Sequence, residues 1–210
     1  MNLAEQYIVK RSEGLTFDFF RHIAMKVLDI DIDIDVFEYK NGNIRAEKAH
    51  VTFKKDSLKY ECDFCESHNY EMCFFPVTIH GGTFICFRKA LYGFVLISTA
   101  TLEVEYEYFP ECVFDGRESF VIADVKQIEN ILLFDGCYWA FPYECFAFDY
   151  DKKLFLNISE LCGMYDLNDM TVEDNKLILY GVDEDENKKQ VTVSIRDIYF
   201  GINNHSKKDF

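Results

Sequence analysis

The clearest pattern along the chain is a series of short runs rich in Val, Ile, Phe and Tyr, separated by turn residues. In residues 29–35, Asp and Ile alternate, so a strand there would place the aspartates on one face and the isoleucines on the other. Runs of this length, bounded by Gly, Asn, Asp or Ser, are typical of β-strands. The pattern predicts a mainly β protein built from antiparallel hairpins.

Turn residues between the runs predict where the hairpins close. Asn41-Gly42 is typical of a two-residue hairpin turn, because both residues readily adopt positive φ angles. Lys55-Asp56-Ser57 and Gly81-Gly82 separate further pairs of runs, and the polar stretch 183–189 predicts a longer, solvated hairpin loop. The segment His80-Gly81-Gly82 resembles part of an esterase oxyanion hole, but no G-x-S-x-G motif accompanies it, so we interpret it as a turn.

Helical patterns are scarce. Residues 16–28 predict one N-terminal helix, although their Phe and β-branched residues leave a strand possible. The residues that would share one helical face are Phe20, Ile23, Ala24, Val27 and Leu28. Residues 158–165 predict a short helix or helical turn, and the polar residues 203–210 predict a frayed tail.

A loose repeat in the C-terminal two thirds bears on the architecture. Three times an apolar strand is followed by an alternating strand, and the spacings from Leu96 to Leu133 and from Leu133 to Leu179 are 37 and 46 residues. Such spacings are close to those of propeller blades. No Pro-, Gly- or Ser-rich linker interrupts the chain, so we expect one domain over residues 1–210. It would be a two-layer sandwich or a small propeller-like array.

The net charge of the chain argues against some classes of binding partner. The chain carries 22 Lys and Arg against 37 Asp and Glu, a formal net charge of −15. This balance argues against binding to nucleic acid or to an anionic membrane surface, since both attract basic proteins. With 49% hydrophobic and 17% aromatic residues, the chain is expected to fold rather than to be disordered.

The cysteines and the N-terminal sequence predict a cytoplasmic protein. The first residues lack the cationic and apolar regions of a signal peptide, and no apolar window is long enough to span a membrane. Free thiols in a reducing cytosol therefore fit better than disulfides. The eight cysteines are Cys62, Cys65, Cys73, Cys86, Cys112, Cys137, Cys145 and Cys162.

Two clusters could hold a metal ion. Cys62, Cys65, His68 and Cys73 combine thiolate and imidazole groups as in compact zinc sites. The alternative, which we favour, is a pair of strands joined by a turn at residues 65–69. The aspartates of residues 29–35 could attract Ca²⁺, but neighbours on one strand face lie about 7 Å apart, so a solvated face is favoured. Neither a metal nor a cofactor is expected.

The segment 135–144 is the most distinctive in the chain and contains its one tryptophan. Its rings could form a binding surface, or they could fill the end of the β core. We favour the second interpretation for Trp139. The candidate binding residues are Asp135, Tyr138, Trp139, Phe141, Tyr143 and Glu144.

These features favour a non-enzymatic, acidic protein-interaction module that binds a basic protein. One version is an inhibitor or immunity-type protein that masks a basic toxin or nuclease. The alternative is an enzyme, for example a carbohydrate-active one, with carboxylates near Trp139, where Asp135 and Glu144 flank the loop as a pair. No catalytic motif identifies such an enzyme, so its catalytic residues stay unassigned.

Overall fold

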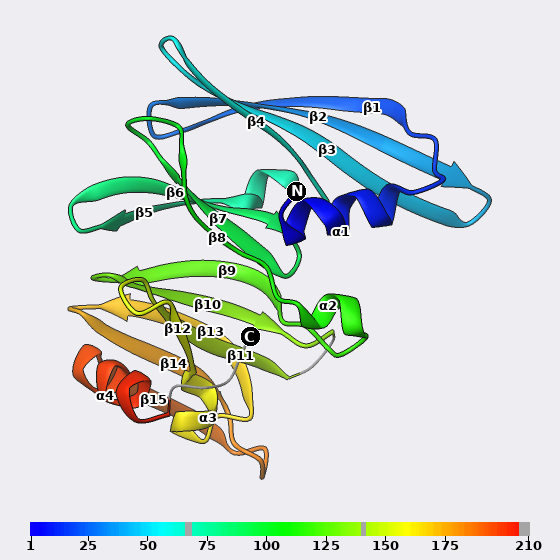
Figure 1. The fold of residues 1–210 in the computed structure, drawn as a ribbon. Coiled ribbons are helices and arrows are strands. Elements are labelled where there is room, and N and C mark those ends of the chain that lie inside the picture. The colour runs from blue at the N-terminus through cyan, green and yellow to red at the C-terminus, as the bar shows by residue number, and fades with distance from the viewer. Residues whose placement is uncertain (66–68, 140–141, 206–210) are drawn as a thin grey trace. The chain divides into compact units, whose positions relative to one another are not determined.

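Figure 1 shows a computed structural model of the chain, which describes residues 1–65, 69–139 and 142–205. The strands form four sheets, and in each sheet consecutive strands of the sequence lie side by side. The pairs with a defined register are antiparallel. This arrangement confirms the predicted mainly β fold of antiparallel hairpins.

The strand bounds follow the chain order. The first sheet contains β1 (Asp18–Val27), β2 (Ile30–Asn41), β3 (Ile44–Lys55) and β4 (Leu58–Phe64). The second contains β5 (Phe74–Ile79), β6 (Gly82–Ala90), β7 (Gly93–Ser98) and β8 (Val104–Tyr108). The third contains β9 (Val121–Ile128), β10 (Ile131–Cys137), β11 (Tyr143–Asp149) and β12 (Leu154–Asn157). The fourth contains β13 (Asp166–Glu173), β14 (Lys176–Val182) and β15 (Lys188–Ser194).

The helices are short. They are α1 (Leu3–Ser12), the 3₁₀ helix η1 (Tyr70–Cys73), α2 (Cys112–Asp115), α3 (Ile158–Cys162) and α4 (Ile195–His205). Among the described residues, no helix is both long and apolar enough to cross a membrane. Helix α4 continues to His205, so residues 203–205 are helical where a frayed tail was predicted, and residues 206–210 lie outside the described residues.

The predicted turns join the expected strands. Asn41 pairs with Ile44, so the first turn consists of residues 42 and 43, one position later than predicted. His80 and Gly81 have φ angles of 51° and 75° and form the turn between β5 and β6, one position earlier than the predicted Gly81-Gly82. The His-Gly-Gly segment is thus part of a turn, as interpreted. The polar residues after β14 form the predicted loop to β15.

The predicted N-terminal helix over residues 16–28 is wrong, because most of this segment forms β1. Strand β2 presents isoleucines with 0% exposure on its inner face, and β1 aligns Ile23 and Met25 with them. The N-terminal helix is instead α1, whose capping box joins Asn2 and Glu5.

The chain divides into two compact units. Unit 1 comprises Met1–Pro76 and Gly82–Glu111, and unit 2 comprises Val77–Gly81 and Cys112–Phe210. The sequence predicted a single domain, and the number of independently folding domains stays a prediction.

Rings join the two sheets of unit 1. Phe87 of β6 lies with its ring centroid 5.5 Å from Phe53, 5.0 Å from Phe64 and 4.9 Å from Phe74. Three of these rings are fully buried, and the fourth, Phe74, is 7% exposed. Because Phe53 and Phe64 belong to the first sheet and the other two rings to the second, this cluster holds a two-layer sandwich together.

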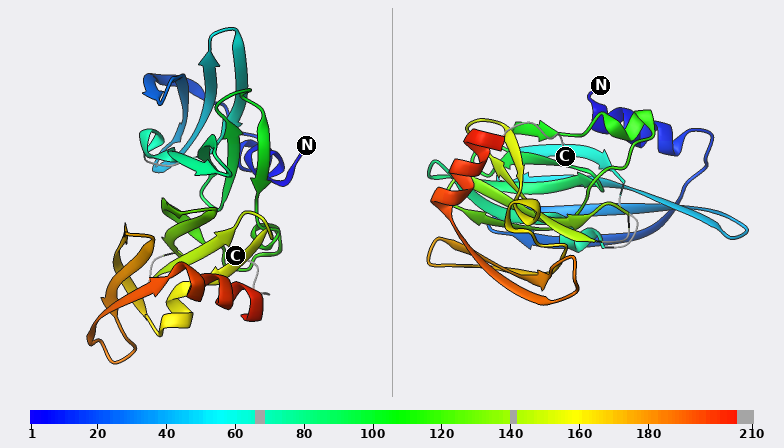
Figure 2. Two further views of the ribbon diagram at one scale, coloured as in Figure 1. Left: turned by 90° about the vertical axis from the view of Figure 1, so that its left-hand side faces the viewer. Right: turned by 90° about the horizontal axis from the view of Figure 1, so that it is seen from below.

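Unit 2 is also layered. Its core combines apolar residues of the third sheet, the fourth sheet and α4. Leu133 and Ala147 come from the third sheet and Leu177 and Leu179 from the fourth, all with 0% exposure. Helix α4 packs against β12 and β15, and Figure 2 shows it in two further views.

The aromatic cluster of unit 1 predicts the cost of a core substitution. Phe87→Ala removes a buried ring that contacts both sheets, so it should lower the free energy of unfolding by about 3–5 kcal/mol. The control Phe19→Ala changes a ring that is 61% exposed and should stay within about 1 kcal/mol of the parent. Urea unfolding followed by far-UV circular dichroism measures both. Equal midpoints for the two variants would contradict the assignment of Phe87 to the core.

Candidate functional site

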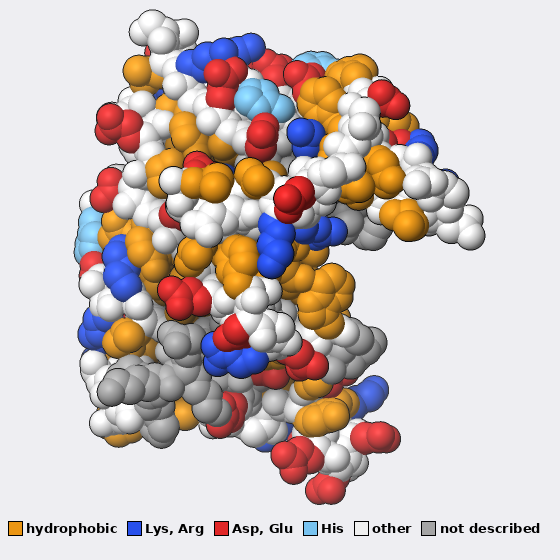
Figure 3. All heavy atoms as spheres, turned by 45° about the vertical axis from the view of Figure 1, so that its right-hand side comes forward, with side chains coloured by type: hydrophobic (Ala, Val, Ile, Leu, Met, Phe, Trp, Pro, Cys, Tyr) orange, Lys and Arg blue, Asp and Glu red, His pale blue; other side chains and the backbone are white. Residues whose placement is uncertain are grey.

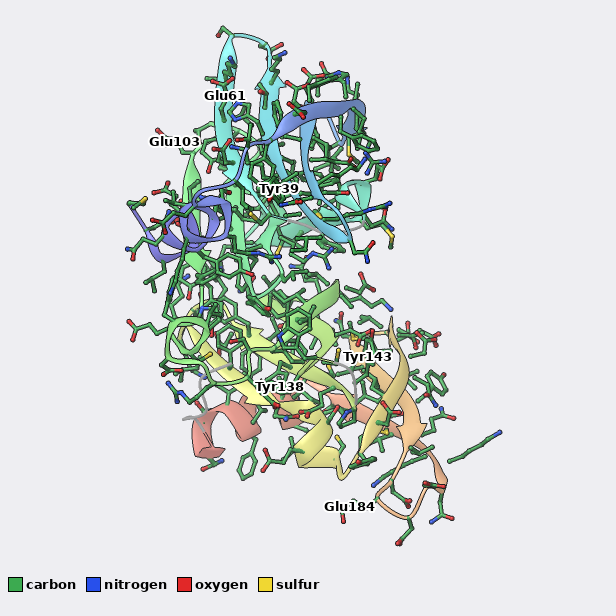
Figure 4. The ribbon with its side chains drawn as sticks, turned by 90° about the vertical axis from the view of Figure 1, so that its right-hand side faces the viewer. Tyr39, Glu61, Glu103, Tyr138, Tyr143 and Glu184 are labelled. Atoms are coloured by element: carbon green, nitrogen blue, oxygen red, sulfur yellow. The ribbon has the colours of Figure 1, made fainter. Side chains whose placement is uncertain are left out.

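Unit 2 contains a pocket of about 870 Å³. The chain around Tyr138, β11, α3 with the residues after it, and the β14–β15 loop all contribute to its lining. Its aromatic and apolar residues are Tyr138, Pro142, Phe146, Met164 and Tyr165. Its polar and charged residues are Arg117, Glu144, Asn157, Glu160, Asp183, Glu184 and Asp185, with Gly163 between the two groups. Tyr138 and Glu184 are labelled in Figure 4.

A helix cap positions one of the carboxylates, that of Glu144. Asn157 is the N-cap of α3, and its Oδ1 accepts a hydrogen bond of 2.9 Å from the backbone N–H of Glu160. The Nδ2 of the same asparagine donates to Oε2 of Glu144. Asn157 therefore fixes the start of α3 and orients Glu144 on β11. Gly163 ends the helix in the left-handed conformation, with φ of 60°.

The β14–β15 loop supplies three more carboxylates. Asp183 Oδ1 accepts backbone hydrogen bonds from Asn187 and Asp185, at 2.9 and 3.0 Å. The hydrogen bond from the backbone N–H of Asn187 is the largest cause that lowers the pKa of Asp183 below its usual value. This side chain is therefore ionised and shapes the loop. Glu184 and Asp185 are exposed beside it. Figure 3 shows acidic side chains gathered at the end of unit 2 where β14 and β15 turn.

Among the described residues, Arg117 is the cation that lines the pocket, and Asp115, outside the lining, already pairs with it. Arg117 Nη2 lies 2.7 Å from Asp115 Oδ2, and its Nε donates to the same oxygen at 2.8 Å. The hydrogen bond from Arg117 lowers the pKa of Asp115 below its usual value. The described lining residues therefore include five carboxylates and one paired arginine, and Lys189 donates a hydrogen bond of 2.9 Å to the carbonyl of the lining residue Gly163.

Tyr138 provides the pocket with a neutral ring. It is partly buried, with its centroid 5.5 Å from Phe120 and 6.4 Å from Phe146. Burial, followed by the charge of Glu144, raises the pKa of Tyr138 to about 12. Its hydroxyl is therefore protonated at neutral pH and can donate a hydrogen bond.

The structure separates the six residues that the sequence grouped. Asp135 pairs with Cys145 across the β10–β11 ladder, whereas Glu144 pairs with Gly136. Directly opposite residues share a sheet face and neighbours alternate, so Asp135 and Glu144 point to opposite faces. The predicted pairing of these two carboxylates is wrong. Tyr143 shares the face of Asp135 and packs partly buried against the core of unit 2.

Asp135 lies in an unfavourable environment for a charge. Burial, followed by the charge of Asp124 directly opposite on β9, raises the pKa of Asp135 to about 6. Its Oδ1 is buried, and no described residue donates a hydrogen bond to it. Asp135 is therefore held close to other carboxylates, away from the pocket.

Trp139 is 60% exposed, so the interpretation of its ring as a plug of the core is wrong. Its φ of 49° marks a change in chain direction directly after Tyr138. Tyr138, one residue earlier, instead packs its ring against Phe120 and Phe146. Phe141 lies outside the described residues.

Three of the four residues proposed as zinc ligands lie in the described part of the chain. Cys65 and Cys73 are buried, Cys62 is partly buried on β4, and His68 lies outside the described residues. Burial raises the pKa of Cys62 to about 11. No group of three or more His, Cys, Asp or Glu residues in the described part of the chain could hold a metal ion. The predicted strand pair is wrong, because β4 and β5 belong to different sheets and η1 precedes β5.

The structure describes the eight cysteines as free thiols, as predicted. Three of the four alternating aspartates lie as predicted, because Asp31, Asp33 and Asp35 occupy the outer face of β2 opposite its buried isoleucines, whereas Asp29 lies in the turn before β2.

The sequence did not indicate that Glu160, Tyr165 and the loop carboxylates would join Tyr138 and Glu144. The available signals were local ones: the short predicted helix after Asn157 and the acidic loop at residues 183–189. Their meeting depends on how the third and fourth sheets pack, which no local pattern encodes.

Comparisons with known proteins show no family. No family model and no curated protein matches the chain. A solved structure described as "Crystal structure of HIRA(644-1017)" is similar, with a TM-score of 0.37 and 8% sequence identity. The match covers 86% of this chain and 58% of that protein.

Exposure predicts opposite effects at two adjacent rings. Trp139→Ala should change the free energy of unfolding by less than about 1 kcal/mol, because the indole is largely in water. Tyr138→Ala should lower it by about 2 kcal/mol, because its partly buried ring contacts two others. Chemical denaturation of both variants measures the difference. A loss at Trp139 as large as that at Tyr138 would refute this assignment.

The raised pKa of Asp135 predicts a pH-dependent gain from Asp135→Asn. The folded state binds the proton more tightly than the unfolded state, so the parent loses stability as the pH rises from 3.8 through about 6. Asparagine cannot ionise, so the variant should be more stable than the parent at pH 8 by about 1 kcal/mol, a value reduced for partial exposure. Denaturation at pH 4 should show a smaller gain. An equal gain at both pH values would exclude ionisation as the cause.

Proposed function

We propose that this chain is a non-enzymatic, acidic interaction module that binds a basic segment of a partner protein in the pocket of unit 2. The observation that carries the proposal is the set of five carboxylates around one pocket, whose arginine is already paired. The net charge of −15 would steer a basic partner toward the chain.

The lining suits a guanidinium or ammonium side chain. Glu144 and Glu160 both line the pocket, and carboxylates form charge-assisted hydrogen bonds with Arg or Lys. The rings of Tyr138 and Tyr165 provide faces on which a cation can stack. Arginine fits this combination better than lysine, because its planar group both stacks and binds carboxylates with two hydrogen bonds.

One version of this function is an inhibitor or immunity-type protein that covers the basic surface of a toxin or nuclease. The same charge would repel phosphate, so nucleic acid and anionic membranes are not proposed as partners. A cytoplasmic location belongs to the same proposal, because eight free thiols suit a reducing compartment.

A carbohydrate-active enzyme is the second candidate. With Asp135 on the other face of the sheet, the acids of such an enzyme would be Glu144 and Glu160, beside Tyr138. The pocket supports this candidate less well, because three further carboxylates surround that pair. Release of sugar from a glycoside by the purified chain, lost in Glu144→Gln, would favour the enzyme over the interaction module.

Charge-neutralising variants test the module. Glu160→Gln, Glu184→Gln and Asp185→Asn together should weaken binding of a nonaarginine peptide about tenfold or more, and the salt dependence should become shallower. The matched control carries Glu13→Gln, Asp18→Asn and Glu103→Gln, three exposed acids of unit 1. Since −15 + 3 = −12 for both variants, they have the same net charge. Isothermal titration calorimetry measures the affinities.

The control should stay within about twofold of the parent. Equal losses in the two triple variants would mean that net charge alone attracts the peptide, and the pocket would then have no specific role. A nonalysine peptide, compared with nonaarginine, tests the expected preference for guanidinium groups.

A further inference from the structure

A second concave site lies in unit 1, on the outer face of the first sheet. Its volume is about 540 Å³, and its lining comes from β2, β3, β4 and the segment between α1 and β1. The strand register explains how the site forms. Phe37 pairs with Lys48, and His50 pairs with Asp63, so these side chains occupy two neighbouring rows of one sheet face.

The apolar part of this groove consists of Leu15, Phe17 and Phe37, each partly exposed. The ring of Phe17 lies 6.3 Å from that of Tyr39, which is labelled in Figure 4. The chain entering β1 therefore lies against the sheet face and forms one side of the groove. A ligand with an apolar body would find two phenylalanine rings there.

Lys48 is a charged residue of the groove, and it has no carboxylate partner among the described residues. Its Nζ lies 5.1 Å from the centroid of Phe17, and no described residue forms an ion pair with it. The other lysines on this sheet face each have a carboxylate near their Nζ. The distances are 3.4 Å for Lys26 to Asp31, 2.7 Å for Lys54 to Asp33 and 2.6 Å for Lys59 to Glu61.

The remaining charged groups of the groove pair with one another. His50 Nδ1 lies 2.8 Å from Asp63 Oδ1, and its Nε2 lies 3.7 Å from Glu61 Oε1. Asp63 is thus directed toward the imidazole. Lys48 lies beside two rings and has no carboxylate partner among the described residues. In a chain with a net charge of −15, this combination points to an anionic ligand.

We propose that this groove binds a small organic carboxylate with an aromatic body. The carboxylate would pair with Lys48, and the ring would lie against Phe17 and Phe37. The volume is within the range of small-molecule sites. This site lies outside the proposed function, because it belongs to unit 1 and takes a ligand of the opposite charge.

The test titrates the full chain with 2-naphthoate by isothermal titration calorimetry, with the neutral 2-naphthalenemethanol as the matched ligand. Naphthoate should bind at one site, with an affinity that falls as salt is added. The neutral alcohol should bind about tenfold more weakly, because it lacks the partner for Lys48.

Substitutions locate the site. Lys48→Met keeps the aliphatic stem, removes the charge and should weaken naphthoate binding about tenfold. Lys48→Arg should restore most of the affinity, which would show that Lys48→Met acts through charge rather than through misfolding. The control Lys54→Met, on the same strand and face, should leave the affinity within about twofold of the parent.

Three outcomes would overturn the proposal: unchanged binding in Lys48→Met, equal losses in Lys48→Met and Lys54→Met, or equal affinities for naphthoate and the alcohol. Binding of an Asp-Phe-Asp-Phe peptide without binding of naphthoate would also overturn it, in favour of a protein ligand. None of these results bears on the acidic pocket, whose test uses a cationic peptide.

Discussion

Burial of apolar strand residues is the constraint on which the rest of this structure depends. A sheet with one wet face needs alternating residues, and β2 meets that need with isoleucines inside and aspartates outside. The same alternation determines which side chains remain available for function. The acidic pocket and the groove of unit 1 both use residues that face away from a sheet-to-sheet core or stand at its end.

Cross-strand register explains why the strands could be predicted and the site could not. Alternation and turn residues are local, so the sequence indicated β2 and β3, and it placed their turn within one residue. Whether Asp135 meets Glu144 depends instead on pairing between strands: a shift of one residue would move either carboxylate to the other face. The described residues of the segment 135–144 divide between two sheet faces, and Trp139 is exposed.

The N-terminal segment is a second case in which local sequence does not determine the structure. Residues 16–28 satisfy a helical pattern and a strand pattern, and local propensity does not decide between them. The decision comes from β2, whose buried inner face extends beside Ile23 and Met25 and offers them cross-strand neighbours. The capping box of α1 is, by contrast, a local signal, since Asn2 and Glu5 lie three residues apart.

The acidic side chains of this chain are paired with cations to different extents at different places. On the outer face of the first sheet, aspartates meet lysines and histidines of neighbouring strands, so much of the charge there is compensated at short range. In the pocket of unit 2, one arginine faces five carboxylates and already has a partner. A cationic ligand would add charge-assisted hydrogen bonds to these carboxylates. Lys48 presents the converse case, a cation whose nearest described partner is a ring. The two places therefore differ in sign, and the two proposals assign them ligands of opposite charge.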